Sequence, residues 1–122
     1  QSKTANILFT VGLQQRLGGK GITAFAVHPG GIRTNLGRHM TEEDMAWMRG
    51  RMKAQSDEEM LAAFKTIPQG AATSCYAATA TELTGRGGVY CEDCHVAAVD
   101  DADPTGGVRS YAVDPGTADQ LW

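Results

Sequence analysis

Three short segments of this 122-residue chain carry residue types that could support chemistry. Ser2-Lys3 opens an apolar run, and residues 28–34 read His-Pro-Gly-Gly-Ile-Arg-Thr. Residues 91–95 have the Cys-x-x-Cys-His spacing of a c-type haem attachment site. Taken singly, a lysine at a helix start is usually solvated, and Pro-Gly commonly ends a strand. The elements that position these segments must therefore decide between the interpretations.

Hydrophobic periodicity predicts a helix over 2–17 and a strand over 22–27. Apolar residues recur in the helix at three- and four-residue spacing, at Ala5, Leu8, Phe9, Leu13 and Leu17. The strand has apolar residues on both faces, which is typical of a central strand in a parallel sheet covered by helices. Such a strand would deliver the 28–34 loop to the carboxyl edge of the sheet, where open α/β folds bind ligands.

Capping patterns mark three further helix starts. Thr41 precedes three acidic residues, Ser56 is followed by Glu59, and Thr66 is followed by Gln69. Because no linker divides the chain, residues 1–122 are interpreted as a single domain fragment. Its later parts are expected in the order segment 36–65 with two helices, helix 67–81, strand 88–91, and an irregular tail 92–122 that ends in a short helix.

In this order, the segments resemble the second half of a short-chain dehydrogenase/reductase. Ser2-Lys3 with Ala5-Asn6 is similar to the end of the family's Tyr-x-x-Ser-Lys-x-Ala-Asn pattern, and the 28–34 loop is similar to its Pro-Gly loop. Further similar stretches follow in the expected order, at 68–73, 87–90, 111–115 and 121–122. The resemblance implies an α/β fold, the C-terminal portion of a Rossmann-like doubly wound parallel sheet. The loop and tail are most similar to the branch of retinol dehydrogenases and the WW-domain oxidoreductase.

The resemblance also implies roles for individual residues. Lys3 would be catalytic, since the family's lysine binds the nicotinamide ribose hydroxyls and lowers the pKa of a catalytic tyrosine. Pro29 and Gly30 would also bind the cofactor, as part of the 28–34 loop. The Ile32 backbone would pair with the nicotinamide carboxamide, and the Thr34 hydroxyl would contact the carboxamide or the pyrophosphate. The implied cofactor is NAD or NADP, and the implied reaction interconverts an alcohol and a carbonyl.

Segment 36–65 corresponds to the family's substrate lid. Its candidates for lining an apolar substrate are Met40, Met45, Trp47 and Met48, because methionines adapt to irregular apolar ligands. Packing between the lid helices is the alternative role for the same side chains.

Parts of the family pattern have no counterpart in this sequence. The tyrosine would fall before Gln1, and a glycine-rich turn between a strand and a helix is not found. Because two strands do not form a stable sheet unaided, we expect association with a missing N-terminal half or a second copy, with a homo-oligomer through helix 2–17. The chain alone is therefore expected to be inactive. The alternative is a non-catalytic remnant that acts as an interaction or structural protein.

Composition excludes several classes of function. A net charge of -3 and a pI near 5.5 argue against nucleic-acid binding, and no apolar run is long enough for a membrane span. Three cysteines without an export signal favour reduced thiols and a cytoplasmic location. Haem attachment is a remote alternative because the motif ends a predicted strand. No metal site is expected, since zinc needs four ligands.

Overall fold

The structure is a computed structural model that describes residues 2–102 and 106–122. The α/β class expected from the sequence is confirmed. The elements of the described part are α1 (Ser2–Leu17), β1 (Ala26–His28), α2 (Glu42–Met52), α3 (Asp57–Ala62), α4 (Ile67–Thr79), β2 (Tyr90–Glu92), β3 (His95–Val96) and α5 (Pro115–Leu121), with short 3₁₀ turns between them.

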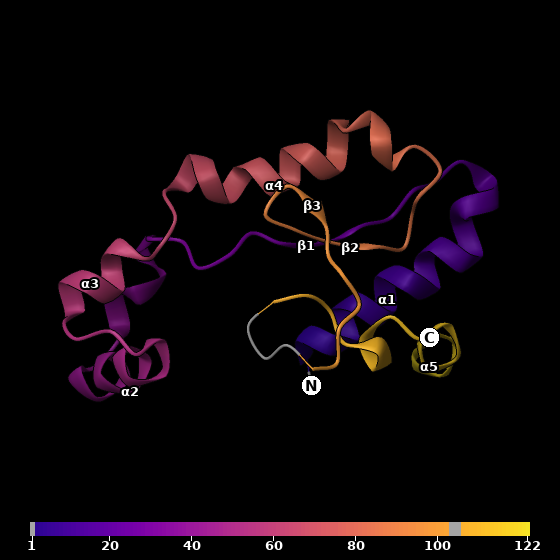
Figure 1. The fold of residues 1–122 in the computed structure, drawn as a ribbon. Coiled ribbons are helices and arrows are strands. Elements are labelled where there is room, and N and C mark those ends of the chain that lie inside the picture. The colour runs from indigo at the N-terminus through magenta and orange to yellow at the C-terminus, as the bar shows by residue number, and fades with distance from the viewer. Residues whose placement is uncertain (1, 103–105) are drawn as a thin grey trace.

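A small sheet forms the middle layer of the molecule. Its order is β1-β2-β3, and β1 pairs parallel to β2 with Ala26 opposite Tyr90 and His28 opposite Glu92. Figure 1 shows α4 on one side of the sheet and α1 on the other. Both faces of the strands are therefore covered by helices, as the apolar pattern of the first strand predicts.

The sheet is mixed, which corrects the expectation of an irregular chain directly after residue 91. Strand β3 runs antiparallel to β2, with Glu92 opposite His95. Asp93 and Cys94 make the tight turn between them with φ of 45° and 58°. Two successive left-handed residues give a turn whose twist matches a β-hairpin. Neither residue is a glycine, so the sequence carries no strong signal for this turn.

Within the described residues the first strand lies at an edge of the sheet, not in its centre as the sequence predicts, and both parallel strands begin later than predicted. Strand β1 is Ala26–His28 rather than 22–27, and β2 is Tyr90–Glu92 rather than 88–91. Gly88 has a φ of 82°, which is outside strand geometry, although its N–H still donates to the Ala24 carbonyl at 2.7 Å. The Ala24 N–H is taken by the Gln14 side chain at 3.0 Å. Regular pairing therefore starts only beyond these two positions.

The helix starts follow the predicted capping residues, whereas the end of α4 differs from the prediction. Thr66 and Gln69 form a complete capping box at α4. Ser56 accepts a hydrogen bond from the Glu59 N–H, but the Glu59 carboxylate accepts from the Gln55 N–H, one residue early. Helix α4 ends at Thr79, not at 81, because the chain turns to an extended conformation at the next residue.

Helix α1 covers the predicted range, but its buried stripe is shifted. Leu8 and Val11 pack against Ala118 of α5, and Gly12 lets the two helices approach closely. Phe9 is 51% exposed and stacks on Trp122 at 5.3 Å. Periodicity gives the spacing of the stripe, but the position of α5 decides which side of α1 is buried.

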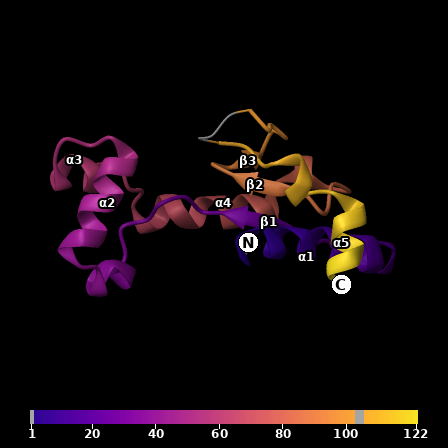
Figure 2. The same ribbon diagram turned by 90° about the horizontal axis from the view of Figure 1, so that it is seen from below.

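The chain has two regions of different construction. Helices α2 and α3 pack mainly on each other and form a lobe, here residues 35–62, that lies to one side of the rest. The remainder, here called the body, is the sheet with α1, α4 and α5. Two connecting segments join the lobe to the body (Figure 2). Among the described residues, no helix is both long and apolar enough to cross a membrane.

Candidate functional site

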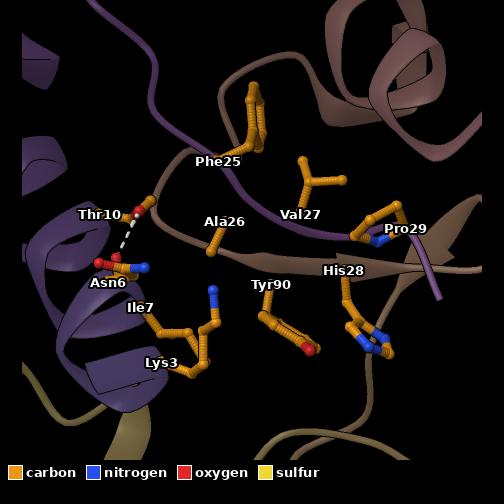
Figure 3. Close-up of a pocket in the computed structure, with 10 residues that line it drawn as sticks. All are labelled: Lys3, Asn6, Ile7, Thr10, Phe25, Ala26, Val27, His28, Pro29 and Tyr90. Carbon is orange, nitrogen blue, oxygen red and sulfur yellow. Dashed lines mark hydrogen bonds between the residues drawn. The ribbon is translucent and has the colours of Figure 1, made fainter. Parts of the chain in front are cut away.

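The first cavity lies between α1 and β1 and has a volume of about 470 Å³. One face of α1 lines it with Lys3, Asn6, Ile7 and Thr10, at the spacing that places helix residues side by side. The other walls come from the two parallel strands and the residues beside them, Phe25, Ala26, Val27, His28, Pro29 and Tyr90. Figure 3 shows the amine of Lys3 directed toward the strand.

This cavity follows an open edge of β1. Phe25 and Val27 point to the opposite side of the strand from Ala26 and His28, yet all four line it. Residues of both strand faces reach one cavity only where the cavity wraps around a strand edge. Within the described residues, β1 pairs only with β2, so its other edge lacks a neighbouring strand. The cavity therefore lies partly between α1 and the sheet and partly along the unpaired edge of β1.

Tyr90 and His28 form the floor of the cavity beside Lys3. Their rings stack with centroids 6.2 Å apart and planes inclined by 17°. Burial, followed by the nearby charge of Glu92, raises the pKa of the Tyr90 hydroxyl. Tyr90 therefore stays protonated at neutral pH and lines the cavity as a neutral hydroxyl.

The 28–34 loop leads from this cavity to a second one. Pro29 lines the first cavity together with Lys3, whereas Ile32 and Thr34 line the second. Gly30 lies between them with a φ of 87°, a conformation that favours glycine. The structure thus separates the predicted cofactor residues into two groups that face two neighbouring cavities.

The second cavity has a volume of about 280 Å³ and lies at the base of the lobe. Of the predicted lid residues, Met40, Met45 and Met48 line it, whereas Trp47 is 65% exposed beneath the Arg51 guanidinium, 5.6 Å from its ring. Its remaining apolar walls come from Ile32, Met60, Leu61 and Phe64. The cavity is therefore apolar, with Thr34 and Arg33 supplying the polar groups.

Proteins of known name match the chain along most of its length. A "Probable oxidoreductase" of Streptomyces lividans is 46% identical over 123 residues, 99% of this chain and 41% of the relative. "Short-chain dehydrogenase TIC 32 B, chloroplastic" of Brassica napus is 41% identical over 124 residues, 100% of this chain and 33% of the relative. "Retinol dehydrogenase 14" of Homo sapiens is 43% identical over 94 residues, 77% of this chain and 26% of the relative. No family model and no solved structure matches the chain significantly.

The plant relative is named a short-chain dehydrogenase, and the other two are named an oxidoreductase and a retinol dehydrogenase, at an identity too high for a likeness of fold alone. The chain belongs to the short-chain dehydrogenase/reductase family. The resemblance drawn from its motifs is confirmed, and the human relative agrees with the branch that those motifs suggested. The chain spans 41% of the length of the two Streptomyces relatives.

The residues of this short-chain dehydrogenase/reductase fit one end of a dinucleotide. The first cavity presents an ammonium from Lys3 and an amide from Asn6, which suit ribose hydroxyls. The carboxyl end of β1 forms another wall, the place where open α/β sheets bind ligands. The sequence has no glycine-rich turn between a strand and a helix for a pyrophosphate. The residues of this cavity therefore suit a ribose, and no group for the pyrophosphate is recognised in the sequence.

Sequence reasoning missed several residues of this family member's site. Asn6 and Thr10 share a helix face with Lys3, so their spacing could have identified them. Tyr90 reaches the cavity only because it pairs opposite Ala26, which local sequence does not reveal. The contact between Lys65 and Asp93 likewise joins residues far apart in the chain.

The Cys-x-x-Cys-His segment has a structural role in the described region. Cys91 is fully buried and therefore faces no ligand. The Cys94 N–H donates to the Thr73 hydroxyl at 3.3 Å, which ties the β2–β3 turn to α4. This arrangement lends no support to haem attachment, which needs two accessible thiols. No group of three metal-ligating side chains gathers among the described residues.

Proposed function

We propose that the chain is the nicotinamide-facing and substrate-facing part of an NAD(P)-dependent oxidoreductase that interconverts an alcohol and a carbonyl. The observation that carries this proposal is the meeting of Lys3 with the carboxyl end of β1 and Pro29 in one cavity (Figure 3). A cation in a cavity that reaches the carboxyl end of a parallel strand suits a ligand with hydroxyl groups in an open α/β fold.

In this proposal, each residue acts on a nearby group. The nicotinamide ring, when bound, accepts or supplies the hydride. Lys3 holds the ribose hydroxyls, and its charge lowers the pKa of a phenol contributed by residues outside this chain. The Pro29 and Gly30 backbone shapes the end of the loop. Ile32 and Thr34, which line the second cavity, contact the carboxamide side of the cofactor in this proposal.

The second cavity is proposed to receive the apolar part of the substrate. Met40, Met45 and Met48 line it beside Thr34, so an apolar chain would lie next to the end of the cofactor loop. Thioether side chains adapt to different apolar shapes. Trp47 is outside this lining and instead lines a separate, shallower pocket with His39 and Asp44.

The open edge of β1 supports a proposal about partners. We propose that a strand from elsewhere in a longer protein, or from a second copy, pairs with this edge and completes the first cavity, and that this chain alone is inactive. A homo-oligomer through α1 would have to use the side of Phe9, because α5 already covers Leu8 and Val11. The cytoplasm remains the proposed location, because an odd number of cysteines favours reduced thiols.

The test compares this chain with the longest open reading frame that contains it. Both are purified and assayed for dinucleotide binding and for NAD(P)H oxidation with aliphatic and aromatic carbonyls. The longer protein is expected to turn over, and Lys3→Met to lower kcat by about 10²- to 10⁴-fold. Lys20→Met, a change at an exposed lysine beyond α1, is the matched control and should leave kcat unchanged.

Two outcomes would count against the proposal. A folded longer protein that neither binds a dinucleotide nor oxidises it favours the non-catalytic interaction protein. Equal activity of Lys3→Met and the control removes Lys3 from the mechanism. Tight dinucleotide binding by this chain alone would contradict the claim that part of the cofactor site lies elsewhere.

A further inference from the structure

We propose that Lys65 is a positioning residue that fastens the base of the lobe to the cofactor loop and to the β2–β3 turn. The inference rests on the proposed function only in assigning the 28–34 loop to cofactor binding. Lys65 ends the segment that returns from the lobe, directly before α4. It was not among the residues that the sequence singled out.

The N–H and the carbonyl of Lys65 both form hydrogen bonds with the 28–34 loop. Its N–H donates to the Gly31 carbonyl at 2.8 Å, and its carbonyl accepts from the Arg33 N–H at 3.1 Å. Ile32 and Lys65 thereby form an isolated parallel bridge. The two segments that enter and leave the lobe are thus joined where they meet the body.

The side chain of Lys65 extends this junction to two further segments. Its ammonium donates to the Pro29 carbonyl at 3.4 Å and forms an ion pair with the Asp93 carboxylate. The hydrogen bond from Lys65 holds the pKa of Asp93 below its usual value. Asp93 lies in the turn that follows β2. One ammonium therefore bridges the loop at the first cavity and the end of the neighbouring strand.

Gly30 provides the space for this bridge. A Cβ at Gly30 would lie 2.8 Å from Nζ and 2.9 Å from Cε of Lys65, so any side chain there would displace the ammonium. Gly30 also has a φ of 87°. The glycine is thus needed for its conformation and for the passage of Lys65 across the loop backbone.

The consequence is a coupling between the lobe and the loop. Because α2 and α3 pack mainly on each other, the hydrogen bonds of Lys65 are one of the non-covalent restraints on the base of the lobe. A movement of the lobe that pulls on Lys65 would therefore move the Pro29 carbonyl. Lys65 acts through the loop, without a direct role in the chemistry.

The experiment measures hydrogen exchange at the Arg33 and Lys65 amides in the longest reading frame that contains this chain. In Lys65→Met, which keeps the aliphatic stem, these amides are expected to exchange about 3- to 10-fold faster, as loss of a partly exposed charged bridge allows. Asp93→Asn should give a smaller change because the Pro29 contact remains. The double variant should match Lys65→Met, since Asp93→Asn removes only an interaction that Lys65→Met already breaks.

Lys53→Met, at the C-terminal end of α2, is the control for loss of a lysine charge. It should leave exchange of the Arg33 and Lys65 amides unchanged. Where turnover is measurable, KM for the dinucleotide should rise by a similar factor in Lys65→Met, with kcat nearly constant. Unchanged exchange, or an equal change in the control, would overturn the proposal. Exchange needs no activity, so failure of the proposed function leaves this test intact. If Lys65→Met does not fold, the proposal is tested by Asp93→Asn, in which unchanged exchange would overturn it.

Discussion

The body and the lobe are stabilised in different ways. In the body, residues distant in sequence share a core, as Leu8 and Val11 do with Ala118. The lobe has a smaller interior, in which Met60 is completely buried. Its helices depend on local caps, since Thr41 and Asp44 form a complete capping box at α2. The lobe is therefore specified mainly by nearby residues, and the body by contacts between distant segments.

This difference suits the roles proposed for the two regions. A site for a cofactor needs groups held in fixed positions, which a packed sheet supplies. A lid must move, and regions that move have few buried contacts. The two tryptophans make the comparison measurable, because Trp47 lies in α2 and Trp122 follows α5.

The largest expected effects come from core truncation in each region. Met60→Ala and Leu8→Ala should each lower the local free energy of unfolding by about 2–5 kcal/mol. Urea unfolding would be followed by fluorescence in Trp47→Phe and Trp122→Phe backgrounds, each with one tryptophan left. We expect Met60→Ala to shift mainly the Trp47 transition, and Leu8→Ala mainly that of Trp122. Identical shifts of both reporters would show that the two regions unfold as one unit.

A smaller effect is expected where the lobe joins the body. A Cβ at Gly70 would overlap with the Ile32 side chain, so Gly70→Ala should cost about 1–3 kcal/mol through overpacking. Gly50→Ala in α2 is the matched control, because a Cβ there meets nothing within 4 Å. It should instead stabilise the lobe by about 0.5–1 kcal/mol. The midpoints of urea unfolding measure both changes in stability. A Gly70→Ala variant as stable as the unchanged protein would show that Ile32 and α4 are loosely packed.

Loss of a helix N-cap should lower stability by a similar amount in the two regions, but a different tryptophan should report each change. Thr66→Ala removes the capping side chain of α4, and Thr41→Ala removes that of α2. Each change should cost about 1 kcal/mol. Thr41→Ala should shift the transition of Trp47, whereas Thr66→Ala should shift that of Trp122. Serine at either position is the control, since its hydroxyl retains the cap.

The smallest effect is a dependence of α2 on acid. Hydrogen bonds from the Thr41 backbone and hydroxyl lower the pKa of Asp44 below 3.8. A lowered carboxyl pKa stabilises the fold above its unfolded value, and this contribution is lost as pH falls through the folded value. Helix α2 should therefore fray below about pH 4, as seen in NMR shifts during a titration. Asp44→Asn should remove this pH dependence. If the dependence persists in the variant, another titrating group is responsible for it.

Local signals predicted much of the fold and one part of the site. The range of α1, the capping box of Thr66 with Gln69, and the parallel direction of the two predicted strands agree with the structure. Each depends on periodicity or on residues three or four apart. The β2–β3 turn escaped prediction because Asp93 and Cys94 adopt positive φ without glycine.

The sequence by itself determined the family, the helix starts and the identity of Lys3 as a candidate catalytic residue. Motifs and helix caps consist of residues that are close together in the chain. Tertiary structure decided what surrounds them. The strand register brings Tyr90 beside Lys3, α5 selects the buried side of α1, and Lys65 meets Asp93 across the loop. These contacts depend on distances between segments far apart in the chain, which are set only when the helices pack on the sheet.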